Sequence, residues 1–191
     1  MRKVLFTGIL CILAAGAGVP LRSSAQAKTT TAPSQSVPSS AQILLDHWNE
    51  IGNKLIAEAE DFPADKYEYK PTPAVRSFAA TEIHVAAVMY WYTDSAMGKK
   101  PRYPDDPARD NLKTKEQVVA YVRKAVQDGA AMIKQQGDAG TRVAVRDWDK
   151  HVEPLSDLAY EVIEHSGEHY GQLVVYYRLN GLVPPESRPK K

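Results

Sequence analysis

Cysteine is almost missing from this sequence of 191 residues. The single one, Cys11, lies in an apolar N-terminal segment and does not follow a convincing lipid-attachment sequence. If that segment is removed, the mature chain has no thiol, which excludes disulfides, thiolate metal ligands and cysteine nucleophiles. The folded chain must therefore be held together by its core.

An excess of charge of either sign is missing as well, because 24 Lys and Arg residues face 23 Asp and Glu residues and both kinds are scattered. The basic residues of the N-terminal segment are Arg2, Lys3 and Arg22, and without them the net charge would be near −2. A nucleic-acid backbone requires a concentrated basic surface. We therefore expect no nucleic-acid partner.

The N-terminus has the three-part layout of a secretory signal peptide: Met1-Arg2-Lys3, an apolar run from Val4 to Val19, and Ala25-Gln26-Ala27. The apolar run is short for a spanning helix. We expect residues 1–27 to be removed and the protein to be exported, periplasmic or extracellular, without stable membrane insertion. Retention of the segment as an anchor is the alternative. Residues 28–40 are polar and proline-containing, which predicts a flexible leader.

Apolar residues at steps of three and four predict four amphipathic helices, at about 40–62, 77–97, 114–137 and 155–181. Ser39 with Gln42 and Thr114 with Gln117 have capping-box spacing, and Gly137 should stop the third helix. Val143 and Val145 permit only a brief extended piece.

These elements predict an all-α four-helix bundle over residues 41–185, with a disordered tail at 186–191. Trp148 should cover one end of the bundle. The proline-rich connection from Lys99 to Lys113 is long enough to cross the bundle, so the second and third helices can run parallel.

The last helix carries two histidines, His165 and His169, one turn apart on an otherwise apolar stripe that we expect to face inward. The stripe consists of Leu155, Leu158, Val162, His165, His169, Gln172, Tyr176 and Leu179. Two unpaired buried imidazoles would cost roughly 1–3 kcal/mol each. Either a metal ion lies between them or they are core histidines bonded to carboxylates or backbone.

His84 lies on an inward face of the second helix, with Thr81, Val88 and Trp91. Together with His165 and His169 it forms the predicted three-histidine site, which would leave a coordination position open for water or substrate. His47 flanks the apolar stripe of the first helix and is predicted to be a partly exposed residue rather than a ligand. His151 has no apolar context and is predicted to lie at the surface.

Two other metal-binding motifs of helical proteins have defined spacings around histidine. The Glu-x-x-His motif of di-iron bundles is absent, because the residues three before each histidine are Leu44, Thr81, Trp148, Val162 and Ser166. Residues 165–169 match the inverted zinc-peptidase pattern His-x-x-Glu-His. A bundle of this size lacks an evident peptide cleft, so peptidase activity is disfavoured. Glu168 either polarises a bound water or faces solvent.

Three segments together resemble the DinB/YfiT-like metal-binding four-helix bundle family, over residues 41–185. They are Arg76-Ser77-Phe78 leading into the helix of His84, the run from His165 to Leu173, and the run from Arg178 to Pro185. The resemblance implies a homodimer-prone bundle with a divalent metal held by His84, His165 and His169. Its members include proposed hydrolases, thiol-dependent transferases and isomerases.

We therefore expect an exported metal-dependent hydrolase acting on an unknown small molecule, with Zn²⁺, Ni²⁺, Fe or Mn as the divalent transition metal. Glu168 would be the catalytic residue, and Trp91 and Tyr170 would line the approach to the site. The alternatives are a non-catalytic bundle that binds a ligand or partner with a structural metal, and a thiol-dependent transferase. Export disfavours the transferase, because low-molecular-weight thiols are mainly cytosolic.

Overall fold

The computed structural model describes residues 37–102, 111–147 and 150–189. The signal peptide, most of the leader and Trp148 lie outside these residues, so their predictions are not tested. The elements in chain order are α1 (Ser40–Asp61), η1 (Ala64–Lys66), α2 (Phe78–Ala96), α3 (Lys115–Gly140), β1 (Ala144–Arg146), β2 (Val152–Pro154), α4 (Leu155–Leu179) and η3 (Pro185–Ser187). None of the described helices is long and apolar enough to cross a membrane.

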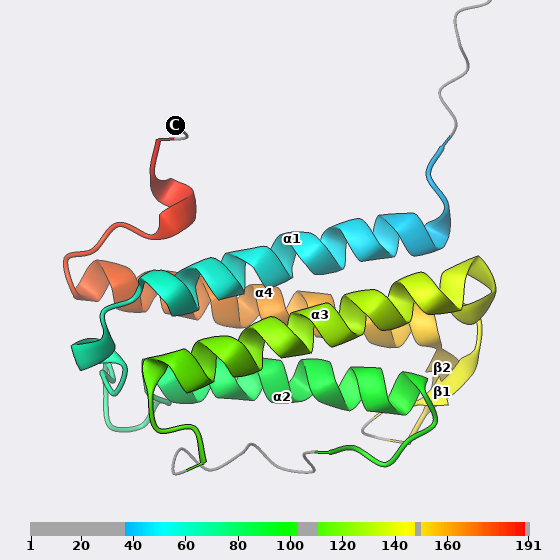
Figure 1. The fold of residues 1–191 in the computed structure, drawn as a ribbon, viewed down its shortest axis with the longest axis horizontal. Helices are drawn as coiled ribbons and strands as arrows, with labels where there is room; N and C mark the ends of the chain where they lie inside the picture. The colour runs from blue at the N-terminus through cyan, green and yellow to red at the C-terminus, as the bar shows by residue number, and fades with distance from the viewer. Residues whose placement is uncertain (1–36, 103–110, 148–149, 190–191) are drawn as a thin grey trace, which may run out of the picture. The chain divides into compact units, whose positions relative to one another are not determined.

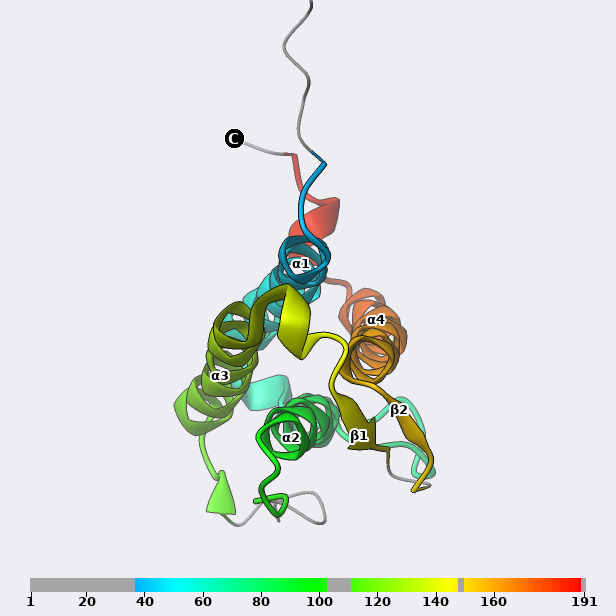
Figure 2. The same ribbon diagram turned by 90° about the vertical axis from the view of Figure 1, so that its right-hand side faces the viewer.

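The four long helices form the predicted bundle. α1 and α4 run in one direction, and α2 and α3 run in the other (Figure 1). Seen end on, α1 and α2 occupy diagonal corners, with α3 and α4 between them (Figure 2). The parallel arrangement of α2 and α3 agrees with the long connection between them.

Side-chain caps fix the starts of three helices at the residues that the sequence indicates. The hydroxyl groups of Ser39, Ser77 and Thr114 accept hydrogen bonds from backbone N–H groups in the first turns of α1, α2 and α3. At Thr114 the full capping box with Gln117 is present. Gly137 has non-helical dihedral angles (φ 58°) and breaks α3 there. A short further helical stretch extends to Gly140.

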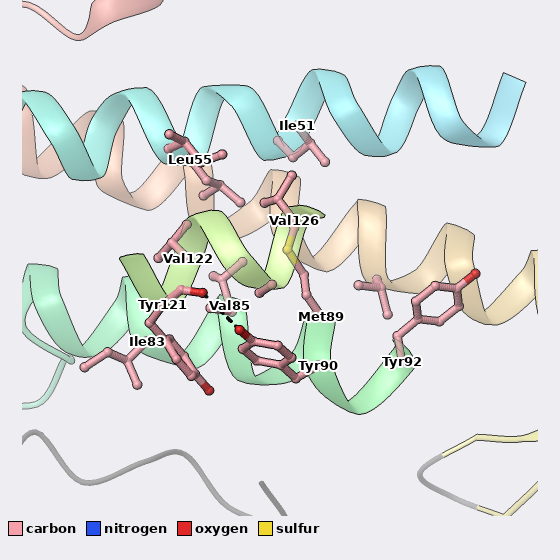
Figure 3. Packing of buried hydrophobic residues seen from close by; sticks show 14 of the residues in the cluster. Ile51, Leu55, Ile83, Val85, Met89, Tyr90, Tyr92, Tyr121, Val122 and Val126 are labelled. Carbon is pink, nitrogen blue, oxygen red and sulfur yellow. Dashed lines mark hydrogen bonds between the residues drawn. The ribbon is translucent and has the colours of Figure 1, made fainter. Parts of the chain in front are cut away.

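The core lies between the helices. Figure 3 shows Ile51 and Leu55 of α1 beside Val122 and Val126 of α3. The Trp48 indole N–H donates to the Val126 carbonyl at 2.9 Å, and both Trp48 and Leu55 are fully buried. Burial of this kind, at roughly 25 cal/mol per Å² of apolar surface, is the main force that holds helices together.

A short antiparallel ribbon connects α3 to α4, with Val145 opposite Glu153. The sequence indicated the extended piece around Val145, but it did not predict the second strand. Residues 152–154 are too few to show a clear alternation, and their pairing depends on the turn between the strands.

The predicted inward stripe of α4 is partly wrong. Leu179 is 58% exposed and Gln172 is also exposed, whereas Leu173 and Tyr177 are buried. A seven-residue step falls about 20° short of two full helical turns. Positions 165, 172 and 179 therefore move progressively away from the buried face, and His165 lies at its edge.

Candidate metal centre

His84 of α2 meets His165 and His169 of α4. The Nε2 atom of His165 lies 3.2 Å from the Nε2 atom of His84 and 3.2 Å from that of His169. One possible ligand atom from each residue lies within 4.8 Å of the others. The two helices are antiparallel neighbours (Figure 1). The one-turn spacing of His165 and His169 places both residues on one side of α4, and both imidazoles meet at the α2 histidine.

These separations fit a shared metal ion. Two nitrogen ligands at 2.0–2.1 Å from a tetrahedral Zn²⁺ are about 3.3 Å apart. A hydrogen-bonded arrangement fits less well, because Nε2 of a neutral imidazole has either one proton or one lone pair. The Nε2 atom of His165 therefore cannot make a good hydrogen bond to both neighbours, whereas a cation between the three atoms satisfies all of them.

Gln172 fixes the tautomer of His169. The Nδ1 atom of His169 lies 2.9 Å from Gln172 Oε1, and an amide oxygen can only accept, so Nδ1 carries the proton. The lone pair of His169 is then on Nε2, which faces the other two histidines. Burial lowers the pKa of His169 and the charges of His84 and Arg76 lower it further, although the bond to Gln172 opposes them. A lowered pKa favours the neutral ring, which is the form that binds metals.

A cavity of about 670 Å³ adjoins this centre, with His169 and Gln172 in its wall. The histidines are only partly covered: His169 is 9% exposed, and His84 and His165 are half-buried. A three-ligand site beside a cavity of this size has room for a further ligand.

The other predicted site residues lie outside the cavity lining. Glu168 is exposed, and Trp91 and Tyr170 are half-buried. Lys54 of α1 lies with its Nζ atom 5.9 Å from the centre of the Tyr170 ring. None of these three is among the described residues that line the cavity. Their roles stay predictions.

The two histidines predicted to lie outside the site, His47 and His151, are both exposed. His151 instead pairs with Asp147 at 3.2 Å.

Sequence reasoning missed the role of Gln172 as partner of His169, although their three-residue spacing on one helix could have indicated it. It also missed Arg76 as part of the cavity. No periodic pattern could have placed Arg76 there, because it lies in the loop before α2.

The comparisons with known proteins identify the family and the fold of this chain. The model of the DinB superfamily matches residues 47–173, which include all three histidines. The chain belongs to the DinB superfamily. Two solved structures of DinB-like proteins show the same fold. The one from Bacillus cereus is 16% identical, with a TM-score of 0.63 and coverage of 75% of this chain and 95% of its own.

The second DinB-like structure, from Bacillus subtilis, is 17% identical, with a TM-score of 0.62 and coverage of 78% of this chain and 99% of its own. No curated protein matches this DinB-family chain. The expected family and fold are thus confirmed, and the histidine cluster allows metal binding.

Proposed function

We propose that this DinB-family chain is an exported, divalent-metal-dependent hydrolase. The observation that carries the proposal is the convergence of the Nε2 atoms of His84, His165 and His169 beside a cavity. Among the expected metals, Zn²⁺ and Ni²⁺ suit a set of imidazole ligands best. When bound, the cation would supply Lewis-acid activation of water or of a substrate group at its open coordination position.

The residues of the chain would perform the remaining tasks. His84 joins α2 to the site, and Gln172 holds the His169 ring in the tautomer whose Nε2 atom can bind metal. Glu168 lies on α4 next to His169 and is exposed, so it could take a proton from an attacking water and return it to solvent. Replacement of Glu168 by Gln should lower kcat by about 10²-fold or more. Glu164→Gln, another exposed change on α4, should not.

Export is proposed from the layout of residues 1–27. It favours hydrolysis over transfer to a low-molecular-weight thiol, because water is the nucleophile available in every compartment. We also propose a homodimer, which the mass in solution tests directly.

Elemental analysis tests the metal site. The protein should be purified from the exported fraction without chelator or affinity metal, beside a variant with His84, His165 and His169 all changed to Ala. About one equivalent of a transition metal is expected in the wild type and none in the variant. The matched control is His47→Ala with His151→Ala, which removes two exposed histidines outside the cluster and should keep the metal.

Hydrolysis itself requires a second measurement. The metal-loaded protein should be screened with chromogenic carboxylic esters, phosphate esters and amides, with His165→Ala as the inactive reference. Activity that disappears in this variant supports the proposal. Stoichiometric metal without hydrolysis of any class would instead favour a binding bundle with a structural metal.

A further inference from the structure

The permanent charge in the cavity beside the metal centre is offset within the loop that carries it. Arg76 is the only side chain with a permanent charge among the described residues that line the cavity. Arg76 already interacts with another residue of the folded chain. The Glu68 carboxylate also lies beside it, because it accepts a hydrogen bond at 3.2 Å from the hydroxyl of Ser77, the next residue. A charged ligand would therefore give up its hydration without meeting an unpaired opposite charge in this wall.

Much of the wall is apolar. It includes Pro71, Ala74, Val75, Val175 and the ring of Tyr176. Val75 and Val175 are 41% and 48% exposed, so contact with a hydrocarbon chain would remove apolar surface from water. A volume of about 670 Å³ is that of a small-molecule site and too small for a folded partner.

The two buried hydroxyl groups of the wall have already used their protons. The Thr81 hydroxyl donates to the carbonyl of Ser77 at 3.0 Å, and the Tyr176 hydroxyl donates to the carbonyl of Arg76 at 2.8 Å. Each hydroxyl has one proton, so the oxygen atoms of Thr81 and Tyr176 can offer a ligand only lone pairs. These two positions of the wall therefore accept hydrogen bonds.

The amide of Gln172 supplies a donor. Its Oε1 atom accepts from Nδ1–H of His169 at 2.9 Å, which fixes the orientation of the amide. The NH₂ group at its other end has no hydrogen-bond partner among the described residues, and Gln172 lines the cavity. The exposed hydroxyl of Thr72 is a second uncharged donor in the wall. The wall thus offers a ligand both uncharged donors and acceptors beside an apolar surface.

The loop that forms half of this wall is held in place before any ligand binds. The bond from Tyr176 to the Arg76 carbonyl ties the loop to α4. The rings of Tyr69 and Tyr176 pack edge to face, with their centres 6.1 Å apart. The N–H group of Val75 donates to the Thr72 carbonyl at 3.3 Å. A wall that is already ordered costs less conformational entropy when a small ligand binds.

We propose that this cavity binds an uncharged carboxamide with a short hydrocarbon chain. The ligand carbonyl accepts from the Gln172 NH₂ group, the ligand N–H group donates to the hydroxyl oxygens of the wall, and the chain lies against Val75 and Val175. The proposal names the substrate class of the site and in that respect rests on the proposed function. A carboxylate would bring an uncompensated charge, and a ketone or ester would leave the acceptors of the wall unused.

The test is binding of hexanamide to the full-length protein, measured by titration calorimetry or ligand-observed NMR. Hexanoate, heptan-2-one and acetamide serve as comparison ligands. They replace the amide by a charged group, replace its NH₂ group by a methyl group, and remove most of the hydrocarbon chain, respectively. We expect hexanamide to bind more tightly than all three. Equal or tighter binding of any of them would overturn the proposal.

Two variants place the ligand in this cavity. Val175→Asp should weaken hexanamide binding about five- to tenfold, because it removes an apolar contact of the chain. The matched control is Val183→Asp, a valine that is 54% exposed and lies outside the cavity lining, and it should leave binding unchanged. Gln172→Glu keeps an oxygen acceptor for His169 but loses the NH₂ donor, so it should weaken hexanamide binding about tenfold while metal content stays normal.

Metal content is measured on the same samples and separates this inference from the proposed function. Normal metal content with hexanamide affinity that neither variant changes would overturn the carboxamide site and leave the metal site standing. Hexanamide binding that depends on Val175 and Gln172 in a protein without metal would support the carboxamide site and reject the metal-dependent hydrolase.

Discussion

Two glutamates, Glu58 of α1 and Glu82 of α2, have fully buried side chains whose four carboxyl oxygens have no hydrogen-bond partner among the described residues. Burial raises the pKa of Glu58 to about 8. Burial, together with the charge of Glu58, raises the pKa of Glu82 well above its usual value. Glu58 is thus mostly neutral in the folded state between its ordinary pKa of 4.5 and about pH 8, where the same residue in the unfolded chain is ionised. The pKa of Glu82 is shifted in the same direction.

The raised pKa of Glu58 makes stability depend on pH. Below pH 4.5, the ordinary value, Glu58 is protonated whether the chain is folded or not, and it has no effect. Between pH 4.5 and about 8 the folded state holds one more proton than the unfolded state, so stability falls as the pH rises. The loss is up to about 1.4 kcal/mol per pH unit.

Replacement of Glu58 by Gln should remove this dependence, since an amide does not ionise. The melting temperature of Glu58→Gln should exceed that of the wild type increasingly between pH 5 and pH 8. Thermal unfolding at several pH values measures the difference. Glu164→Gln, at an exposed position of α4, is the control and should follow the wild type. A difference in melting temperature between Glu58→Gln and the wild type that stays the same from pH 5 to pH 8 would contradict the raised pKa of Glu58.

Gln172 is expected to affect metal affinity through His169, because its side-chain oxygen accepts a hydrogen bond from the Nδ1–H group of His169. Gln172→Leu removes this acceptor, and loss of such a partner typically weakens metal binding 10- to 100-fold. Competition with a chromogenic chelator measures the affinity. Gln172→Glu keeps an oxygen acceptor and should restore most of it; if both variants bind metal like the wild type, Gln172 has no orienting role.

At the scale of the helix, two glycines that look alike in sequence have opposite roles. A Cβ atom at Gly129 of α3 would lie 2.0 Å from Cζ2 of Trp48, whereas a Cβ atom at Gly171 of α4 would have nothing within 4 Å. Gly129 therefore makes room for the fully buried Trp48 of the opposing helix. Gly171 only weakens its helix, since glycine is a poor helix former.

Gly129→Ala should therefore destabilise the bundle by about 1–3 kcal/mol through overpacking against Trp48. Gly171→Ala should stabilise it, by up to about 1 kcal/mol, through helix propensity alone. Denaturant unfolding of the two variants measures both effects. Stabilisation by Gly129→Ala would show that Trp48 can move aside and that its fit against α3 is loose.

The helices could be predicted because their signals are local. Ser77 and Thr114 cap helices where the sequence indicates, and Gly137 breaks α3, because caps and glycine act within one turn. The clustering of His165 with His169 follows from the same local geometry. Leu179 was predicted to face inward, but it is exposed. Residues spaced by alternating steps of three and four do not stay on one face of a straight helix, because each seven-residue step falls about 20° short of two full turns.

At the scale of the whole molecule, contacts between segments that are distant in the sequence could not be predicted. Nothing in the pattern around Glu58 predicts burial without a partner, since a helical glutamate usually faces solvent. The place of Arg76 beside His169 likewise depends on how the loop before α2 packs on α4. His84 was predicted from the inward face of its own helix together with His165 and His169, and the family resemblance implied the same three histidines.

Metal binding should stabilise the entire bundle, because the three histidines come from two helices that only the folded chain brings together. A ligand that binds only the folded state adds about 2.7 kcal/mol when its concentration is 100 times its Kd. The metal-loaded protein should therefore melt several degrees above the same protein treated with chelator.

His84→Ala separates this effect from a general effect of chelator. It removes the α2 ligand and leaves His165 and His169 on one helix, where a bound ion would no longer connect α2 to α4. Its melting temperature should therefore respond little to chelator, and the His47→Ala, His151→Ala control should respond like the wild type. A wild-type melting temperature that does not change with metal would mean that the ion binds folded and unfolded chains equally. The three histidines would then not form a site that depends on the bundle.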